Sequence, residues 1–132
     1  MKIPKVYRNS IVSSMLNMYI FIFTIGIYFV HIPWNLERLN LVETDLGLWL
    51  FIFGILNLLS NQITGRIIAP KIGSKNIIIV GTIIIAICPL LLVSINSYSM
   101  FMFIALPFGI AVGFIFPTNQ SLISYIESKI NK

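Results

Sequence analysis

Polar side chains spaced three and four residues apart near the N-terminus are the groups best suited to chemistry. At 3.6 residues per turn they share one face of a helix, and apolar residues such as Ile20 and Phe23 occupy the opposite face. Their hydroxyl, amide and imidazole groups can bind a polar solute or bond to a neighbouring helix, and the pattern leaves both interpretations open. The series is Ser14, Asn17, Phe21, Thr24, Tyr28 and His31. The candidate solute contacts within it are Asn17, Thr24, Tyr28 and His31.

Catalytic and metal chemistry have little support in this sequence. Its one histidine, His31, and its one cysteine, Cys88, lie far apart in the chain and cannot supply a ligand cluster or a nucleophile paired with a base. No glycine-rich phosphate-binding loop is present either. We therefore predict that the chain is not an enzyme and binds no metal and no cofactor.

The composition places most of the chain in lipid. Of the 132 residues, 58% are hydrophobic and only 10% are charged, with a mean hydropathy of +0.95. A soluble domain carries roughly 25% charged residues and could not bury so much apolar surface. The net charge of +5 does not indicate a nucleic-acid partner, because cytoplasmic loops of membrane proteins collect Lys and Arg. We predict an integral membrane protein whose main partner is the lipid bilayer.

Uncharged stretches set the number of membrane crossings. Stretches free of Asp, Glu, Lys and Arg cover residues 9–36, 46–65 and 76–126. A crossing takes about 20 residues, so the first two stretches hold one helix each. The third is long enough for two helices, and its polar residues 96–99 are of turn-forming types. We predict a single membrane domain, residues 1–132, with helices at 11–32, 46–67, 76–96 and 99–122.

The basic residues predict the orientation of these helices. With the N-terminus inside, Arg38 is the one basic residue that faces outward. This asymmetry follows the positive-inside rule and places both termini in the cytoplasm of a multi-pass protein of the cell inner (plasma) membrane. The residues assigned to the inside are Lys2, Lys5, Arg8, Arg66, Lys71, Lys75, Lys129 and Lys132.

Small residues in the last predicted helix indicate close packing. Ala105, Gly109 and Gly113 recur every four residues, a spacing that lets two helix backbones approach each other. We expect Gly109 and Gly113 to be helix-packing positions. Pro107 and Pro117 should bend this helix or loosen its hydrogen bonding.

A family resemblance lies between the second and third predicted helices. Residues 65–76 resemble the signature loop of the major facilitator superfamily, in which a glycine is followed by an acid, a basic residue, a second glycine and further basic residues. The match requires one inserted residue at Pro70, and the family's acidic residue is missing. The positions assigned to this cytoplasmic loop are Gly65, Arg66, Lys71, Gly73 and Lys75.

Looser resemblances extend over most of the chain. Residues 31–48 look like the first outer loop of bacterial sugar-transporter-like members, and the last helix is also similar to theirs. In the family, helices one and four line the central cavity, which implies Asn119 and Gln120 as further solute contacts. Family members have twelve helices in two halves, so this chain corresponds to a partial N-terminal bundle.

The resemblance implies an all-α integral membrane protein with four transmembrane helices. Its implied function is transport of a small solute as part of a secondary transporter, of which this sequence would be a truncated or fragmentary member. Further helices, from this or another membrane chain, would complete the solute path. The alternative is a small four-helix membrane protein that acts as an oligomeric or accessory subunit.

Overall fold

The computed structural model describes residues 5–130, and these residues form helices joined by short turns. The elements are α1 (Lys5–Arg38), α2 (Glu43–Ile63), the π-helical turn η1 (Thr64–Ile68), α3 (Ala69–Ile72), α4 (Ser74–Val93) and α5 (Tyr98–Ile130). Four segments of the described chain are long and apolar enough to cross a membrane. They are Tyr7–Arg38, Glu43–Ile72, Ser74–Val93 and Tyr98–Lys129. This confirms the predicted all-α class with four membrane-spanning helices.

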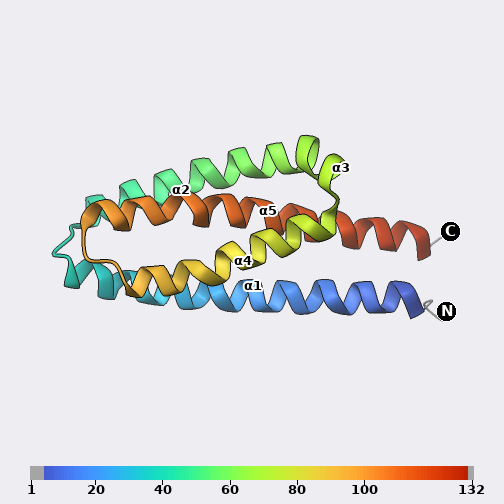
Figure 1. Ribbon diagram of the computed structural model, residues 1–132, viewed down its shortest axis with the longest axis horizontal. Helices are drawn as coiled ribbons and strands as arrows, with labels where there is room; N and C mark the ends of the chain where they lie inside the picture. Colours follow the sequence, from blue (N-terminus) through green and yellow to red (C-terminus); the bar gives the residue numbers. More distant parts are fainter. Residues whose placement is uncertain (1–4, 131–132) are drawn as a thin grey trace.

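The four long helices run up and down in an elongated bundle. Helix α1 begins, and α5 ends, at the end of the bundle that also holds α3, whereas the α1–α2 and α4–α5 turns lie at the other end (Figure 1). We call the first the basic end, because its described charges include Arg8, Arg66, Lys71, Lys75 and Lys129. We call the second the acidic end, because Glu37, Glu43 and Asp45 lie there.

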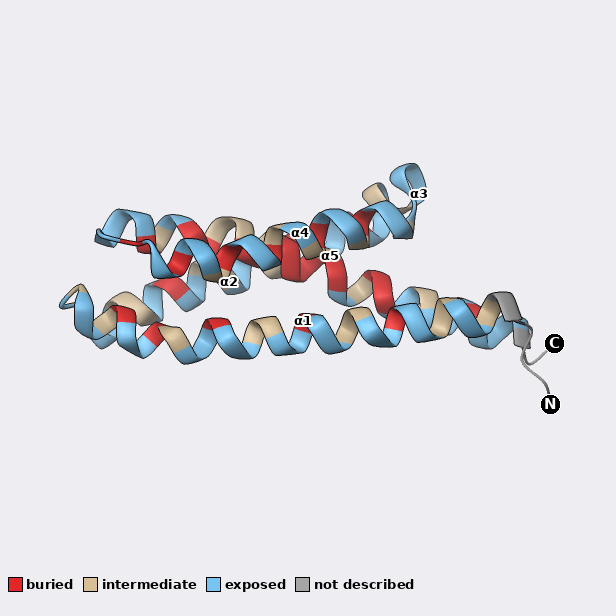
Figure 2. Cartoon of the chain, turned by 60° about the horizontal axis from the view of Figure 1, so that its bottom comes forward, coloured by how far each residue is buried: buried red, intermediate tan, exposed pale blue. Residues whose placement is uncertain are grey.

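Helix α5 is the centre of the bundle. It contacts α1, α2 and α4. Half of the residues in its most apolar 18-residue stretch are buried, compared with 11% in the corresponding stretch of the segment Glu43–Ile72 (Figure 2). Apolar side chains on the outer faces of the other helices are exposed, and Val30 is 74% exposed. In a membrane these outer faces contact lipid, which costs an apolar side chain nothing.

Two glycines let α5 lie close against α2. A Cβ atom added at Gly109 would lie 2.9 Å from the carbonyl oxygen of Phe53. At Gly113 it would lie 2.6 Å from the Cβ atom of Ser60 and 2.7 Å from the carbonyl oxygen of Asn57. The helix faces therefore meet at backbone distance at both positions. Both glycines thus lie at a helix–helix contact, where the spacing of small residues suggested close packing.

Helix α1 is longer than its predicted bounds. The expectation of an outer loop beginning at residue 31 is wrong, because α1 continues through Pro33 to Arg38. The Asn35 side chain donates to the carbonyl oxygen of His31, at a distance of 3.0 Å. This bond ties the Asn35 side chain to its own helix just after the proline, whereas the carbonyl group that Pro33 leaves without an N–H donor is that of Phe29.

The expected cytoplasmic loop is also mostly helical. Residues 64–72 form η1 and α3, and the chain reverses only at Gly73, whose φ of 84° suits glycine. Pro70 explains the π turn, because it lacks an N–H and its ring would clash with the carbonyl group four residues earlier. The N–H of Ala69 instead bonds to the carbonyl oxygen of Thr64, five residues back.

The second half of the chain also differs from the predicted bounds. Helix α4 spans Ser74–Val93 rather than 76–96, and α5 continues to Ile130 instead of ending at 122. Helix α5 is assigned without interruption across Pro107 and Pro117. Near the second proline, the Thr118 hydroxyl donates to the carbonyl oxygen of Phe114 at 2.7 Å, a further bond to the helix backbone.

At the acidic end, Arg38 joins α1 to the end of α4. Its Nη1 donates to the carbonyl oxygen of Val93 at 3.1 Å, and its Nη2 donates to that of Ile95. The guanidinium group also lies 4.3 Å from the ring centroid of Trp34. The positive charge sits where carbonyl groups at a helix C-terminus lack intrahelical partners. We call this set of contacts the Arg38 clamp.

Candidate functional site

Four polar side chains from three helices form one hydrogen-bonded cluster. Ser14 Oγ donates to Asn119 Oδ1 at 2.9 Å, and Asn119 Nδ2 donates to Asn17 Oδ1 at 3.0 Å. Asn17 Nδ2 donates in turn to Thr82 Oγ1 at 2.9 Å. The cluster therefore links α1 to both α4 and α5. We call Ser14, Asn17, Thr82 and Asn119 the polar cluster.

The polar cluster is closely satisfied, as a group in a membrane interior must be. Asn119 Nδ2 also donates to the carbonyl oxygen of Ile115 at 3.2 Å, and Thr82 Oγ1 donates to that of Ile78 at 2.7 Å. Asn17 differs because its amide nitrogen uses one of its two hydrogens within the cluster. Asn17 is also only partly buried, so its second N–H is available to a bound molecule.

A cavity lies beside the polar cluster, towards the basic end. Its volume is about 450 Å³, which is enough for a small solute. Helices α1, α4 and α5 supply its walls. The lining residues are Asn9, Ser10, Ser13, Ser14 and Asn17 from α1, Ser74, Lys75, Ile78 and Ile79 from α4, and Asn119 and Leu122 from α5. We call this space the polar cavity.

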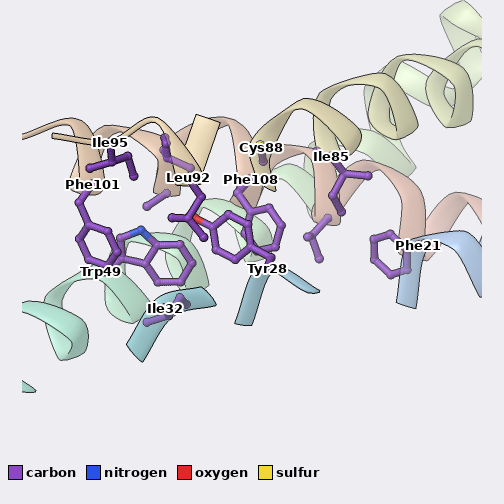
Figure 3. Packing of buried hydrophobic residues seen from close by; sticks show 14 of the residues in the cluster. Phe21, Tyr28, Ile32, Trp49, Ile85, Cys88, Leu92, Ile95, Phe101 and Phe108 are labelled. Carbon is purple, nitrogen blue, oxygen red and sulfur yellow. The ribbon is translucent and has the colours of Figure 1, made fainter. Parts of the chain in front are cut away.

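Aromatic packing fills the bundle nearer the acidic end. The rings of Tyr28 and Phe108 stack with centroids 3.8 Å apart, and Trp49 stacks on Tyr28 at 5.5 Å (Figure 3). Phe53 and Phe101 extend this group through further contacts with Trp49. Tyr28, Trp49, Phe101 and Phe108 are fully buried. We call these five residues the aromatic cluster.

Two polar atoms in the aromatic cluster have no hydrogen-bond partner among the described residues. They are the hydroxyl oxygen of Tyr28 and the Nε1 atom of Trp49. Each unpaired buried group costs about 1 to 3 kcal/mol. The cluster therefore depends on ring stacking and apolar burial for its stability.

The structure brings together two of the predicted solute contacts. Asn17 and Asn119 are hydrogen-bonded to each other, and both line the polar cavity. Gln120, the neighbour of Asn119, is exposed and is not among the residues that line this cavity. Adjacent residues on a helix point about 100° apart, so one face cannot hold both.

The other three predicted contacts lie away from the polar cavity. Tyr28 belongs to the aromatic cluster. The Thr24 hydroxyl donates to the carbonyl oxygen of Ile20 at 2.8 Å, and the His31 Nδ1 atom lies 2.8 Å from that of Ile27. Each of these last two side chains thus bonds to its own helix.

The positions of the family signature divide into two groups. Gly65, Arg66 and Lys71 are exposed on helical turns at the basic end, and Gly73 forms the turn before α4. Lys75 differs from the other two basic residues because it lines the polar cavity. Residues 65–75 therefore run from exposed helical turns at the basic end to the lining of the polar cavity.

Sequence reasoning missed Thr82, which links α4 to the polar cluster. Thr82 carries the one side-chain hydroxyl group in the apolar run 77–87. A polar side chain within a membrane helix needs a hydrogen-bond partner, so the reasoning used for the polar residues of α1 could have identified Thr82. The serines of the cavity, such as Ser13 and Ser74, gave no comparable signal because they lie near predicted helix ends. Among residues 5–130, no group of three or more His, Cys, Asp or Glu could hold a metal ion.

The comparisons with known proteins agree with this architecture. The family model described as Major Facilitator Superfamily matches residues 4–128, which is nearly the whole chain. No curated protein matches the chain, and no solved structure matches it either. The four apolar helices fit part of the N-terminal bundle of such a transporter. The chain belongs to the major facilitator superfamily, a family of membrane transporters.

Proposed function

We propose that this chain forms one wall of a solute pathway in a major facilitator transporter, with the polar cavity as the part that a solute enters. The observation that carries the proposal is the position of Asn119, which bonds to Ser14 and Asn17 of α1 and also lines the cavity. The family resemblance implies that the first and fourth transmembrane helices line the solute cavity. These correspond to α1 and α5 here.

The polar cavity would open towards the cytoplasm of the cell inner membrane. Six basic residues of the described chain lie at the basic end, whereas Arg38 lies at the acidic end. The positive-inside rule places the richer end in the cytoplasm. The aromatic cluster would then lie on the outer side of the cavity.

Further helices would complete the pathway. Alternating access in such transporters requires two bundles that move around a site near the bilayer midplane. The walls of the polar cavity come from α1, α4 and α5, which enclose it only in part. A second bundle, from a longer polypeptide or a separate membrane chain, would cover the open part. The small-molecule solute would bind between the two.

Cysteine accessibility tests this proposal. In a Cys88→Ala background, Ser13→Cys places a thiol in the polar cavity, and Val12→Cys places one at a similar depth on an outer face, where Val12 is 59% exposed. We expect a neutral, water-soluble maleimide to react with the Ser13 variant in inside-out vesicles much faster than with the Val12 variant. Equal rates, or no reaction at position 13, would contradict the proposal.

A further inference from the structure

We propose that the polar cavity selects a small anionic solute, one that carries a carboxylate or phosphate group together with other hydrogen-bonding groups. This inference rests on the proposed function, because it concerns the charge preference of the same cavity. It follows from the side chains that line the cavity, from the position of one lysine, and from the near absence of acidic residues at this end of the bundle.

The neutral lining can bond to any polar solute. Ser13 and Ser74 supply hydroxyl groups from facing helices, and Asn9 supplies an amide. Asn17 adds the N–H that the polar cluster leaves available. Hydroxyl and amide groups both donate and accept hydrogen bonds, so they select polarity but not charge. The sign of the preferred charge must come from another group.

Lys75 supplies that charge. It is the one charged side chain among the described residues that line the cavity. In the whole sequence, Glu127 is the one acidic residue outside positions 37–45, and it is not part of the lining. Charges interact more strongly near a low-dielectric membrane interior than in bulk water. The cavity therefore has a net positive potential with no carboxylate of its own to neutralise it.

The start of α4 adds to the same potential. Ser74 and Lys75 form the first turn of this 20-residue helix, and no side chain caps its N-terminus at Gly73. The free N–H groups of a first turn carry partial positive charge. Because Ser74 and Lys75 also line the cavity, the helix dipole and the ammonium group act on one space.

Lys71 provides a matched control for Lys75. Both are lysines at the basic end, and both would contribute equally to a purely topological charge bias. Both lysines are exposed, but Lys75 is part of the cavity lining and Lys71, on α3, is not. A charge preference that depends on Lys75 and not on Lys71 therefore reports on the cavity and not on the membrane surface.

The test uses charged thiol reagents of similar size. In vesicles of zwitterionic lipid, the Ser13→Cys chain with Cys88→Ala is treated with an anionic reagent, sulfonatoethyl methanethiosulfonate, or a cationic one, trimethylammonioethyl methanethiosulfonate. Rates are divided by those of a free thiol in solution. We expect the anionic reagent to react about fivefold faster than the cationic one. Lys75→Gln should remove this ratio, and Lys71→Gln should leave it unchanged.

Other outcomes overturn the inference in distinguishable ways. A ratio of one or below, or a ratio that survives Lys75→Gln, contradicts the anion preference while the cavity itself stands. Failure of the neutral maleimide to reach position 13 contradicts the proposed function as well. If Lys75→Gln also changes the rate at which the neutral maleimide reacts at position 13, the ratio of anionic to cationic rates is measured in Lys75→Arg, which keeps the positive charge. Retention of the ratio by that variant supports the inference, and its loss opposes it.

Discussion

Asn119 is a single side chain that holds together residues far apart in the sequence. It accepts a hydrogen bond from Ser14 and donates one to Asn17, both on α1. It is fully buried, so each of its polar atoms needs a partner within the bundle. Removing it would leave the hydroxyl group of Ser14 and the amide oxygen of Asn17 without these bonds.

We therefore expect Asn17→Ala and Asn119→Ala to be energetically coupled. Double-mutant cycles in membrane proteins give about 0.6 kcal/mol for such a pair, with a maximum near 1.7 kcal/mol. The measurement is the free energy of unfolding of the single and double variants in detergent micelles. Gln120→Ala serves as the control partner, because Gln120 is exposed. Coupling of Asn17 to Gln120 as strong as to Asn119 would refute the assignment.

Gly113 permits a similar test of helix packing. A methyl group there would clash with the Cβ atom of Ser60 and with the backbone of Asn57, so α2 and α5 must move apart. We expect Gly113→Ala to lower the free energy of unfolding by about 1 to 3 kcal/mol. Gly54→Ala is the control, because a Cβ atom at Gly54 has nothing within 4 Å. Equal effects of the two variants would show that Gly113 is not a packing position.

At the scale of the helices, the number of membrane-spanning helices could be predicted from the sequence, but the residues at which they begin and end could not. Long uncharged stretches identify membrane helices, since a bilayer excludes charges over a fixed thickness. That thickness does not limit a helix that continues beyond the apolar stretch, as α5 does past residue 122 to Ile130. In the structure, helices also continue past the predicted ends at residues 32 and 67 and include Pro33 and Pro70.

The candidate site was predictable to a similar extent. Periodicity placed Asn17 on the inner face of α1, and the family resemblance added Asn119. Nothing in the sequence indicated that Thr24 and His31 would bond to their own helix, because this choice depends on the side-chain rotamer. The contribution of Lys75 to the cavity was equally invisible, since it requires the relative placement of α1 and α4.

The Arg38 clamp gives a prediction about the joined ends of α1 and α4. Arg38→Ala removes the bonds to the carbonyl oxygens of Val93 and Ile95 and the contact with Trp34. We expect a loss of roughly 1 kcal/mol in unfolding free energy, since the site is partly exposed. Arg38→Lys should recover little of it, because an ammonium group lacks the planar fork of donors.

The clamp should also hold the two ends at a fixed separation. Spin labels near the end of α1 and the end of α4 should show a broader distance distribution in Arg38→Ala than in the parent chain. Arg66→Ala, which alters an exposed arginine at the basic end, is the control for general charge effects. An unchanged distribution in the Arg38 variant would remove the case for a clamp.

At the scale of the whole molecule, charge separates the two ends of the bundle. We predict that Lys71→Cys reacts with an impermeant maleimide only from the cytoplasmic side and Thr44→Cys only from outside. Both positions are exposed. Labelling of Lys71→Cys in intact cells would reverse the proposed orientation and the cytoplasmic opening of the polar cavity.

The π turn at Thr64–Ile68 has a consequence for how this sequence could have diverged. A π turn holds one more residue than an α turn, and the family signature matches here only if one residue is inserted at Pro70. An extra residue in a regular helix would rotate everything beyond it by about 100°. Taken up by the π turn, the extra residue does not shift the helical register of α3, which leads into the turn at Gly73. An ancestor could thus have gained the residue in one step without repacking the bundle.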